Sequence, residues 1–232
     1  MDVQTPLLIN DNILYCNTSI QQTFTAKVYT TVLAQLLITC LFTVICKTVQ
    51  SVSQFMLGYI GMGVMFVFFN LWICLSVLIF CFCDEIKKKP YNWIFVSSYT
   101  CLIAYFVGFI GIQNSSEVLL LSGGSTLVLF SVVTIYAWQT KIDHTVKGNY
   151  VIIFLISAPY LIATFFSPSF RMPYPLLGAV IFTLYIIHDT QLLLSPWREI
   201  KYSPDDYAVA TILLYLDVFT LFTYVLDMIN WR

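Results

Sequence analysis

Long unbroken runs of apolar residues constrain the fold of this chain more than any other feature. A helix that crosses the hydrocarbon core of a bilayer needs about 20 predominantly apolar residues. Seven segments meet that requirement, with approximate bounds 28–46, 55–82, 93–112, 118–138, 150–166, 175–194 and 207–229. Strands of a membrane barrel would alternate apolar and polar residues, so unbroken runs favour helices. The sequence therefore predicts an all-α, polytopic membrane protein with seven transmembrane helices.

The composition agrees with a chain that lies mostly in lipid. Hydrophobic residues make up 59% of the 232 residues and charged residues only 10%. A soluble domain carries roughly a quarter charged residues, so this chain has too few to cover a water-facing surface. The net charge of -1 offers no basic surface for nucleic acid. We expect membrane lipid as its surroundings and no nucleic-acid partner.

No linker rich in Gly, Ser or Pro divides the chain, which predicts one transmembrane domain over residues 27–232. A short polar segment, residues 1–26, precedes it. The second apolar segment is longer than one span requires, so we expect it to tilt or break. The glycines within it (Gly58, Gly61 and Gly63) favour close packing of helices.

The distribution of Lys and Arg predicts the orientation in the membrane. Loops on the side of the N-terminus carry eight of these residues and the opposite side carries three. Positive charge concentrates on the cytosolic side, which places the N-terminus in the cytosol. Seven spans would put the C-terminus across the membrane. A last segment that re-enters the membrane would return it to the cytosol, and hydropathy leaves both arrangements open.

Some ionisable residues lie well inside the expected spans and are candidates for function. Asp189, with His188 beside it, belongs to the sixth span, and Asp217 lies near the middle of the seventh. Charged groups at this depth cost several kcal/mol and commonly mark ion or proton pathways. The two spans run antiparallel around a short loop, so the depths of the aspartates differ by roughly one helical turn. The carboxylates could meet if the two helices pack face to face.

Two carboxylates in one desolvated site cannot both ionise easily, so such a pair could hold a proton and release it when conditions change. Asp189 and Asp217 could also coordinate a hard cation such as Ca²⁺ transiently through their oxygens. Alternatively, each aspartate only hydrogen-bonds to a neighbouring helix. His188 is a candidate modulator of the pair, with a packing role as its alternative. Asp227, nearer the helix end, is expected to be solvated.

Enzyme chemistry finds little support in the sequence. The chain has only two histidines, His144 and His188, which does not favour a multi-histidine zinc site. Intramembrane aspartyl proteases also use two aspartates on neighbouring spans, as general acid and base. Their motif is Gly-x-Gly-Asp, whereas bulky Tyr215 and Leu216 precede Asp217 here. We therefore expect no catalytic residues, no enzymatic activity and no bound cofactor.

Motifs in the last two spans carry a specific resemblance. They read Ile186-Ile187-His188-Asp189-Thr190-Gln191, Ser203-Pro204-Asp205-Asp206-Tyr207 and Leu214-Tyr215-Leu216-Asp217. This resembles the signature of the transmembrane Bax inhibitor motif family: Tyr-Asp-Thr-Gln, then Ser-Pro-acidic-acidic-Tyr, then Leu-Tyr-Leu-Asp. The family includes Bax inhibitor, Lifeguard and Golgi anti-apoptotic proteins. Two departures are His188 in place of the usual Tyr, and Ile103 where some members carry an intramembrane Glu.

The resemblance implies seven helices with the last one central, surrounded by the other six. It implies a pH-sensitive Ca²⁺ leak across Golgi or endoplasmic reticulum membranes, with the plasma membrane as an alternative location. Lowering stored Ca²⁺ would inhibit apoptosis, with Ca²⁺ as the permeating ion. Asp189 and Asp217 match the paired carboxylates that share a proton and latch the pore. The alternative is a non-conducting protein that suppresses cell death by binding other membrane proteins of the apoptosis pathway.

Overall fold

The structure is a computed structural model, and every regular element that it describes is an α-helix. The described residues are 18–81, 86, 88, 90–140, 142, 144, 173–194 and 206–230. Their helices are α1 (Thr18–Thr48), α2 (Gln50–Leu57), α3 (Tyr59–Cys81), α5 (Tyr91–Gln113), α6 (Ser116–Gln139), α8 (Pro173–Leu194) and α9 (Tyr207–Asn230). Six of them are long and apolar enough to cross a membrane. The all-α, polytopic fold class predicted from the sequence is confirmed.

Most of the expected spans correspond to observed helices, with one correction and one span that the structure does not describe. Helix α1 begins at Thr18, well before the predicted start at residue 28, because backbone hydrogen bonding continues into polar residues that hydropathy does not mark. It also begins inside the N-terminal segment predicted over residues 1–26. The expected fifth span, residues 150–166, lies outside the described residues.

The long second segment is broken, as its length suggested. Helix α2 ends at Leu57, and Gly58 adopts an extended backbone with φ -74° and ψ 168° before α3 begins. A side chain at Gly61 would overlap the backbone of Phe55 and Met56, so the two helices can meet this closely only with glycine there. The Tyr105 hydroxyl on α5 donates to the Gly61 carbonyl at 2.9 Å, which fixes the corner against the bundle.

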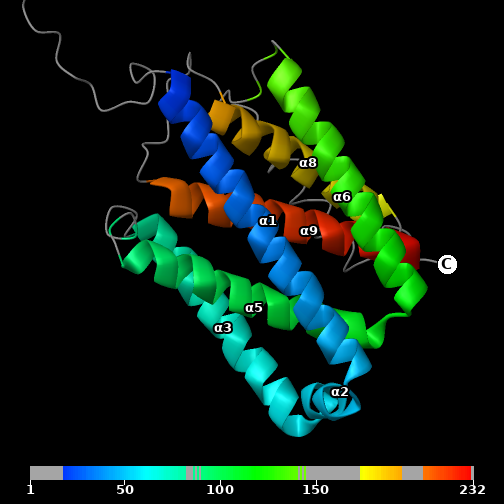
Figure 1. Ribbon diagram of the computed structural model, residues 1–232. Coiled ribbons are helices and arrows are strands. Elements are labelled where there is room, and N and C mark those ends of the chain that lie inside the picture. Colours follow the sequence, from blue (N-terminus) through cyan, green and yellow to red (C-terminus); the bar gives the residue numbers. More distant parts are fainter. Residues whose placement is uncertain are drawn as a thin grey trace, which may run out of the picture.

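Helix α9 lies in the centre of the bundle. It packs against α1, α5, α6 and α8, and in Figure 1 it runs between α8 and α5 with α1 crossing in front. Its buried side chains include Ile212, Leu214 and Leu221, each fully enclosed. Helix α3 lies farther out and packs on α2 and α5. The expected central position of the last helix is therefore confirmed against these four neighbours.

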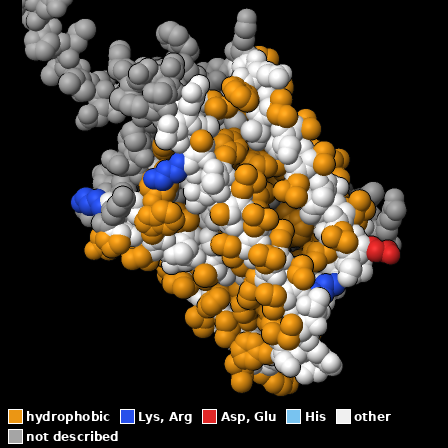
Figure 2. Space-filling model, in the orientation of Figure 1, with side chains coloured by type: hydrophobic (Ala, Val, Ile, Leu, Met, Phe, Trp, Pro, Cys, Tyr) orange, Lys and Arg blue, Asp and Glu red, His pale blue; other side chains and the backbone are white. Residues whose placement is uncertain are grey.

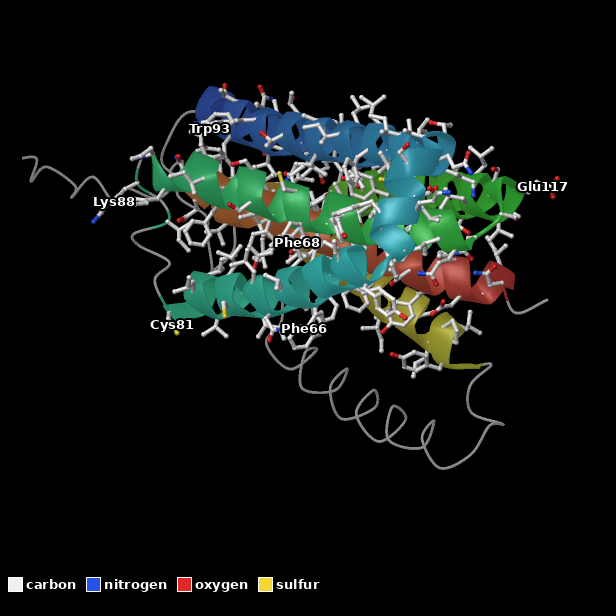
Figure 3. The ribbon with its side chains drawn as sticks, turned by 90° about the horizontal axis from the view of Figure 1, so that it is seen from below. Phe66, Phe68, Cys81, Lys88, Trp93 and Glu117 are labelled. Atoms are coloured by element: carbon white, nitrogen blue, oxygen red, sulfur yellow. The ribbon has the colours of Figure 1, made fainter. Side chains whose placement is uncertain are left out.

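The surface shown in Figure 2 is mostly apolar, and the charged side chains visible on it lie near its margins. Figure 3 places Lys88 and Trp93 at one end of the bundle and Glu117 at the other. An apolar band with charges and aromatic side chains toward its ends is typical of a protein that spans a bilayer.

One end of the bundle is fastened by polar side chains. The Lys47 ammonium, in the last turn of α1, donates to the carbonyls of Gly111 (3.0 Å) and Asn114 at the end of α5. Asn230 is the last residue of α9, and its side-chain amide donates to the Asn114 side-chain oxygen at 2.5 Å. Carbonyls at a helix C-terminus lack partners within the helix, and a cation there is favourable. The ends of α1, α5 and α9 are thereby tied together.

The corner between α2 and α3 generates a prediction about stability. Gly61→Ala should lower the free energy of unfolding in detergent by about 1–3 kcal/mol, because the added methyl group forces the backbones apart. Gly63→Ala is the matched control, since a Cβ at Gly63 has no atom within 4 Å. Thermal unfolding of both variants measures the difference. Equal midpoints for the two variants would contradict the close approach at Gly61.

Candidate functional site

Helices α8 and α9 bring the two intramembrane aspartates together. The helices pack against each other, and the Asp217 carboxyl group lies close enough to that of Asp189 for the two to interact electrostatically. The geometry therefore places two carboxyl groups from neighbouring helices in one site. A hydrogen bond between them would require one of them to carry a proton, because a carboxylate can only accept.

The surroundings of the pair are desolvated and contain few polar groups. The Asp189 side chain is 16% exposed and its Oδ1 lies 2.9 Å from Nδ1 of His188, which is 10% exposed. The second Asp217 oxygen, Oδ2, is buried and has no hydrogen-bond partner among the described residues. Tyr185 interacts electrostatically with both carboxyl groups, and Tyr29 with that of Asp189. These groups are the titratable neighbours of the pair in the described part of the chain.

Asp189 and the two residues after it attach one turn of α8 to three different elements. Asp189 contacts α9, and the Thr190 hydroxyl lies 2.9 Å from the Tyr29 hydroxyl on α1. The Gln191 side chain donates to the Ile142 carbonyl and accepts from the His144 amide, each at 2.9 Å. Thr190 and Gln191 are fully buried. The position of the Asp189 carboxyl is thus fixed by its neighbours in the sequence.

Helix α9 presents a second polar contact on its opposite side. Tyr215 is two residues, or about 200°, from Asp217 around the helix. Its hydroxyl lies 2.5 Å from that of Thr39 on α1, and both side chains are buried. The sequence Tyr215-Leu216-Asp217 therefore fastens the central helix to α1 on one side and to α8 on the other.

A buried polar network on α1 was missed by reasoning from the sequence. The Gln35 amide donates to the Thr100 hydroxyl on α5 at 2.9 Å, and the Thr39 and Thr43 hydroxyls each bond to the carbonyl four residues earlier. All of these side chains are buried. The available signal was the recurrence of Gln35, Thr39 and Thr43 at every fourth position of an apolar run, which marks one face of a helix.

The remaining sequence candidates are placed as follows. Asp227 is exposed near the end of α9, in agreement with a solvated residue, and Ile103 is fully buried among apolar side chains. Residues 203–205 of the loop motif lie outside the described residues. No cluster of three or more His, Cys, Asp or Glu residues that could hold a metal occurs in the described ranges. The acid pair alone offers only two ligand groups for a cation.

Comparison with known proteins adds a family relationship. Residues 21–232 match the family model described as inhibitor of apoptosis-promoting Bax1. Protein lifeguard 3 of Homo sapiens is 29% identical over 220 residues, which cover 92% of this chain and 70% of that protein. Bax inhibitor 1 of Schizosaccharomyces pombe is 29% identical over 223 residues, covering 93% of this chain and 79% of that protein. The matched region contains both aspartates.

The Gln191 contacts generate a prediction about the segment after α6. Gln191→Leu removes both hydrogen bonds to Ile142 and His144, so the His144 amide should exchange its hydrogen roughly fivefold to tenfold faster, as expected for one lost bond. Hydrogen exchange followed by mass spectrometry measures the change. Gln113→Leu is the matched control, because the Gln113 amide is exposed and bonds only within its own helix. Unchanged protection at His144 in Gln191→Leu would contradict the assigned contact.

Proposed function

The chain belongs to the Bax inhibitor family, and we propose that it is a pH-sensitive Ca²⁺ leak channel of intracellular membranes that opposes apoptosis. The observation that carries the proposal is the contact between the Asp189 and Asp217 carboxyl groups within the bundle. Ionisable groups at such depth are retained for ion or proton movement far more often than for packing. The proposed location is the Golgi or endoplasmic reticulum membrane, with the N-terminus in the cytosol.

The gate works through the single proton of the pair. With the proton bound, a hydrogen bond joins α8 to α9 and keeps the pathway closed. Loss of the proton leaves two anions in a medium of low dielectric constant, where their repulsion is strong and barely screened. That repulsion favours separation of α8 from α9. The leak therefore increases as pH rises through the titration of the pair and decreases as pH falls.

The opened pair also suits passage of Ca²⁺. Calcium prefers carboxylate and carbonyl oxygens, and six to eight of them form a stable site. Two carboxylates supply far fewer ligands, and no larger cluster of acidic residues occurs in the described part of the chain. Binding that is favourable enough to admit an ion but weak enough to release it is what conduction requires. In this proposal Ca²⁺ is the transported ion.

In this proposal, His188 modulates the gate through its contact with Asp189. Its ring nitrogen lies 2.9 Å from Asp189, where it can donate to the carboxylate. This contact holds the Asp189 side chain in place, so its loss would alter the gate. The neighbouring hydroxyls of Tyr29 and Tyr185 stay neutral near pH 7 and contribute no charge of their own.

The description of the family model also favours a second candidate function. An inhibitor of apoptosis-promoting Bax1 could act by binding other membrane proteins of the apoptosis pathway without conducting ions. The aspartates would then only hold α8 on α9. This alternative expects protection of cells from apoptosis with no change in stored Ca²⁺. No leak from folded protein in liposomes at any pH would favour it.

Replacement of one gate residue tests the channel. The Asp217→Asn variant cannot ionise at this position, and its amide can donate to Asp189 at every pH. Ca²⁺ flux from liposomes should therefore stay low and lose its increase with pH. Asp227→Asn is the matched control, because Asp227 lies on the same helix but is exposed. A pH profile in Asp217→Asn identical to that of the unaltered protein would exclude gating by the pair.

The role of His188 leads to a separate expectation. His188→Phe keeps the ring volume but removes the nitrogen that contacts Asp189 at 2.9 Å. The midpoint of the flux profile should therefore move, while the maximal flux stays unchanged. Flux measured at closely spaced pH values gives the midpoint. A midpoint that does not move would show that His188 has only a packing role.

A further inference from the structure

An apolar pocket opens at the side of the bundle between α1 and α6. Its volume is about 240 Å³, and α5 and α9 form its floor. The α1 wall includes Leu33, Leu37 and Cys40, and the α6 wall includes Gly123 and Leu127. The pocket lies on a different side of α9 from the acid pair, which faces α8. None of its lining residues takes part in the proposed gate.

The pocket occupies a gap between α1 and α6. The two helices approach each other at the Tyr29 and Phe130 rings, whose centroids are 6.3 Å apart. Beyond that contact, α1 packs on α5 while α6 packs on α8, and both rest on α9. Gly123 leaves the gap unfilled, since a Cβ placed there would meet no atom within 4 Å. The space-filling view in Figure 2 shows apolar side chains around this face of the bundle.

The position of the pocket within the bilayer determines which molecules can enter it. Its lining residues belong to the middle parts of α1, α5 and α9, helices long and apolar enough to span the bilayer. Leu33 and Leu37 at its rim are 53% and 65% exposed, so they face the surrounding medium. At this depth the medium is lipid hydrocarbon, because water is absent from the bilayer core. Apolar cavities of this kind stay dry, and leaving one empty forfeits packing contacts.

The wall chemistry selects one kind of occupant. The only hydroxyl-bearing wall residues besides Tyr215 are Thr39 and Thr126, and each donates to a carbonyl of its own helix at 2.8 Å. The Tyr215 hydroxyl is bonded to Thr39. A ligand with a hydrogen-bond acceptor at this depth would find no free hydroxyl donor on the pocket wall, which is costly in a desolvated site. An unbranched hydrocarbon chain has no polar group and therefore loses no hydrogen bond when it enters the pocket.

We propose that this pocket binds one acyl chain of a bilayer phospholipid. The chain enters between α1 and α6 and packs against Val218 and Phe222 of the central helix, while the headgroup stays at the membrane surface. The bound chain fills the wedge that Gly123 leaves open. The assignment stands without the Ca²⁺ leak, because it uses none of the gate residues.

Photolabelling of the full chain in phosphatidylcholine liposomes tests the site, with a diazirine placed in the middle of an acyl chain. Mass spectrometry should locate the label on pocket residues of α1 and α6. Gly123→Leu fills the gap and should reduce that labelling by roughly tenfold, the effect of about 1.4 kcal/mol in binding. Gly124→Leu is the matched control, because a Cβ there also has open space and Gly124 does not line the pocket.

Three outcomes would overturn the proposal. Equal labelling of all three proteins would show lipid that only surrounds the helices. Equal loss in both leucine variants would show an effect of the glycines on the helix itself. Cross-links from the pocket residues to a second copy of the chain would show a protein interface. Gly123→Leu must give a monodisperse protein with an unchanged thermal midpoint. If it does not, Gly123→Val, which adds less volume, replaces it in the experiment.

Discussion

The position of the central helix depends on a small number of buried polar contacts. Helices in a bilayer gain little from the hydrophobic effect when they associate, because lipid tails are as apolar as their side chains. Packing and hydrogen bonds must supply the specificity. Asp217 binds α8 through Asp189, and Tyr215 binds α1 through Thr39, from opposite sides of α9. The apolar packing of α5 and α6 is arranged around this doubly fastened helix.

The same contacts explain which parts of the structure could be predicted from the sequence. Length and apolarity were enough to predict most of the helices, and the length of the second segment allowed for the break that the structure has at Gly58. The meeting of Asp189 with Asp217 followed from their depths on adjacent antiparallel spans. The partners on α1 were not predicted, although Gln35, Thr39 and Thr43 recur at every fourth position and so mark one face of the helix. Tyr29 became recognisable only from its contact with Thr190. The Gln191 contacts cross between separate elements, which no local pattern encodes.

The central helix lies between two different environments. One side carries the acid pair of the proposed gate, where a single proton would decide between a hydrogen bond and repulsion. Another side forms the floor of a pocket open to lipid between α1 and α6. A perturbation on either side acts on the same rigid element, so proton binding and lipid packing can both influence where α9 sits. Packed interfaces of this kind tend to have discrete arrangements and not a continuous range.

The polar tie among Lys47, Asn114 and Asn230 restricts how α9 can move. Because the end of α9 is held, the helix cannot easily slide along its axis, but it can tilt like a lever about that end. Asp217 lies thirteen residues before Asn230, or about 20 Å along the axis. A tilt of about 5° would displace it by roughly 2 Å, enough to break a hydrogen bond. A pivot at the membrane surface thus converts a small angular change into separation of two groups deep in the bilayer.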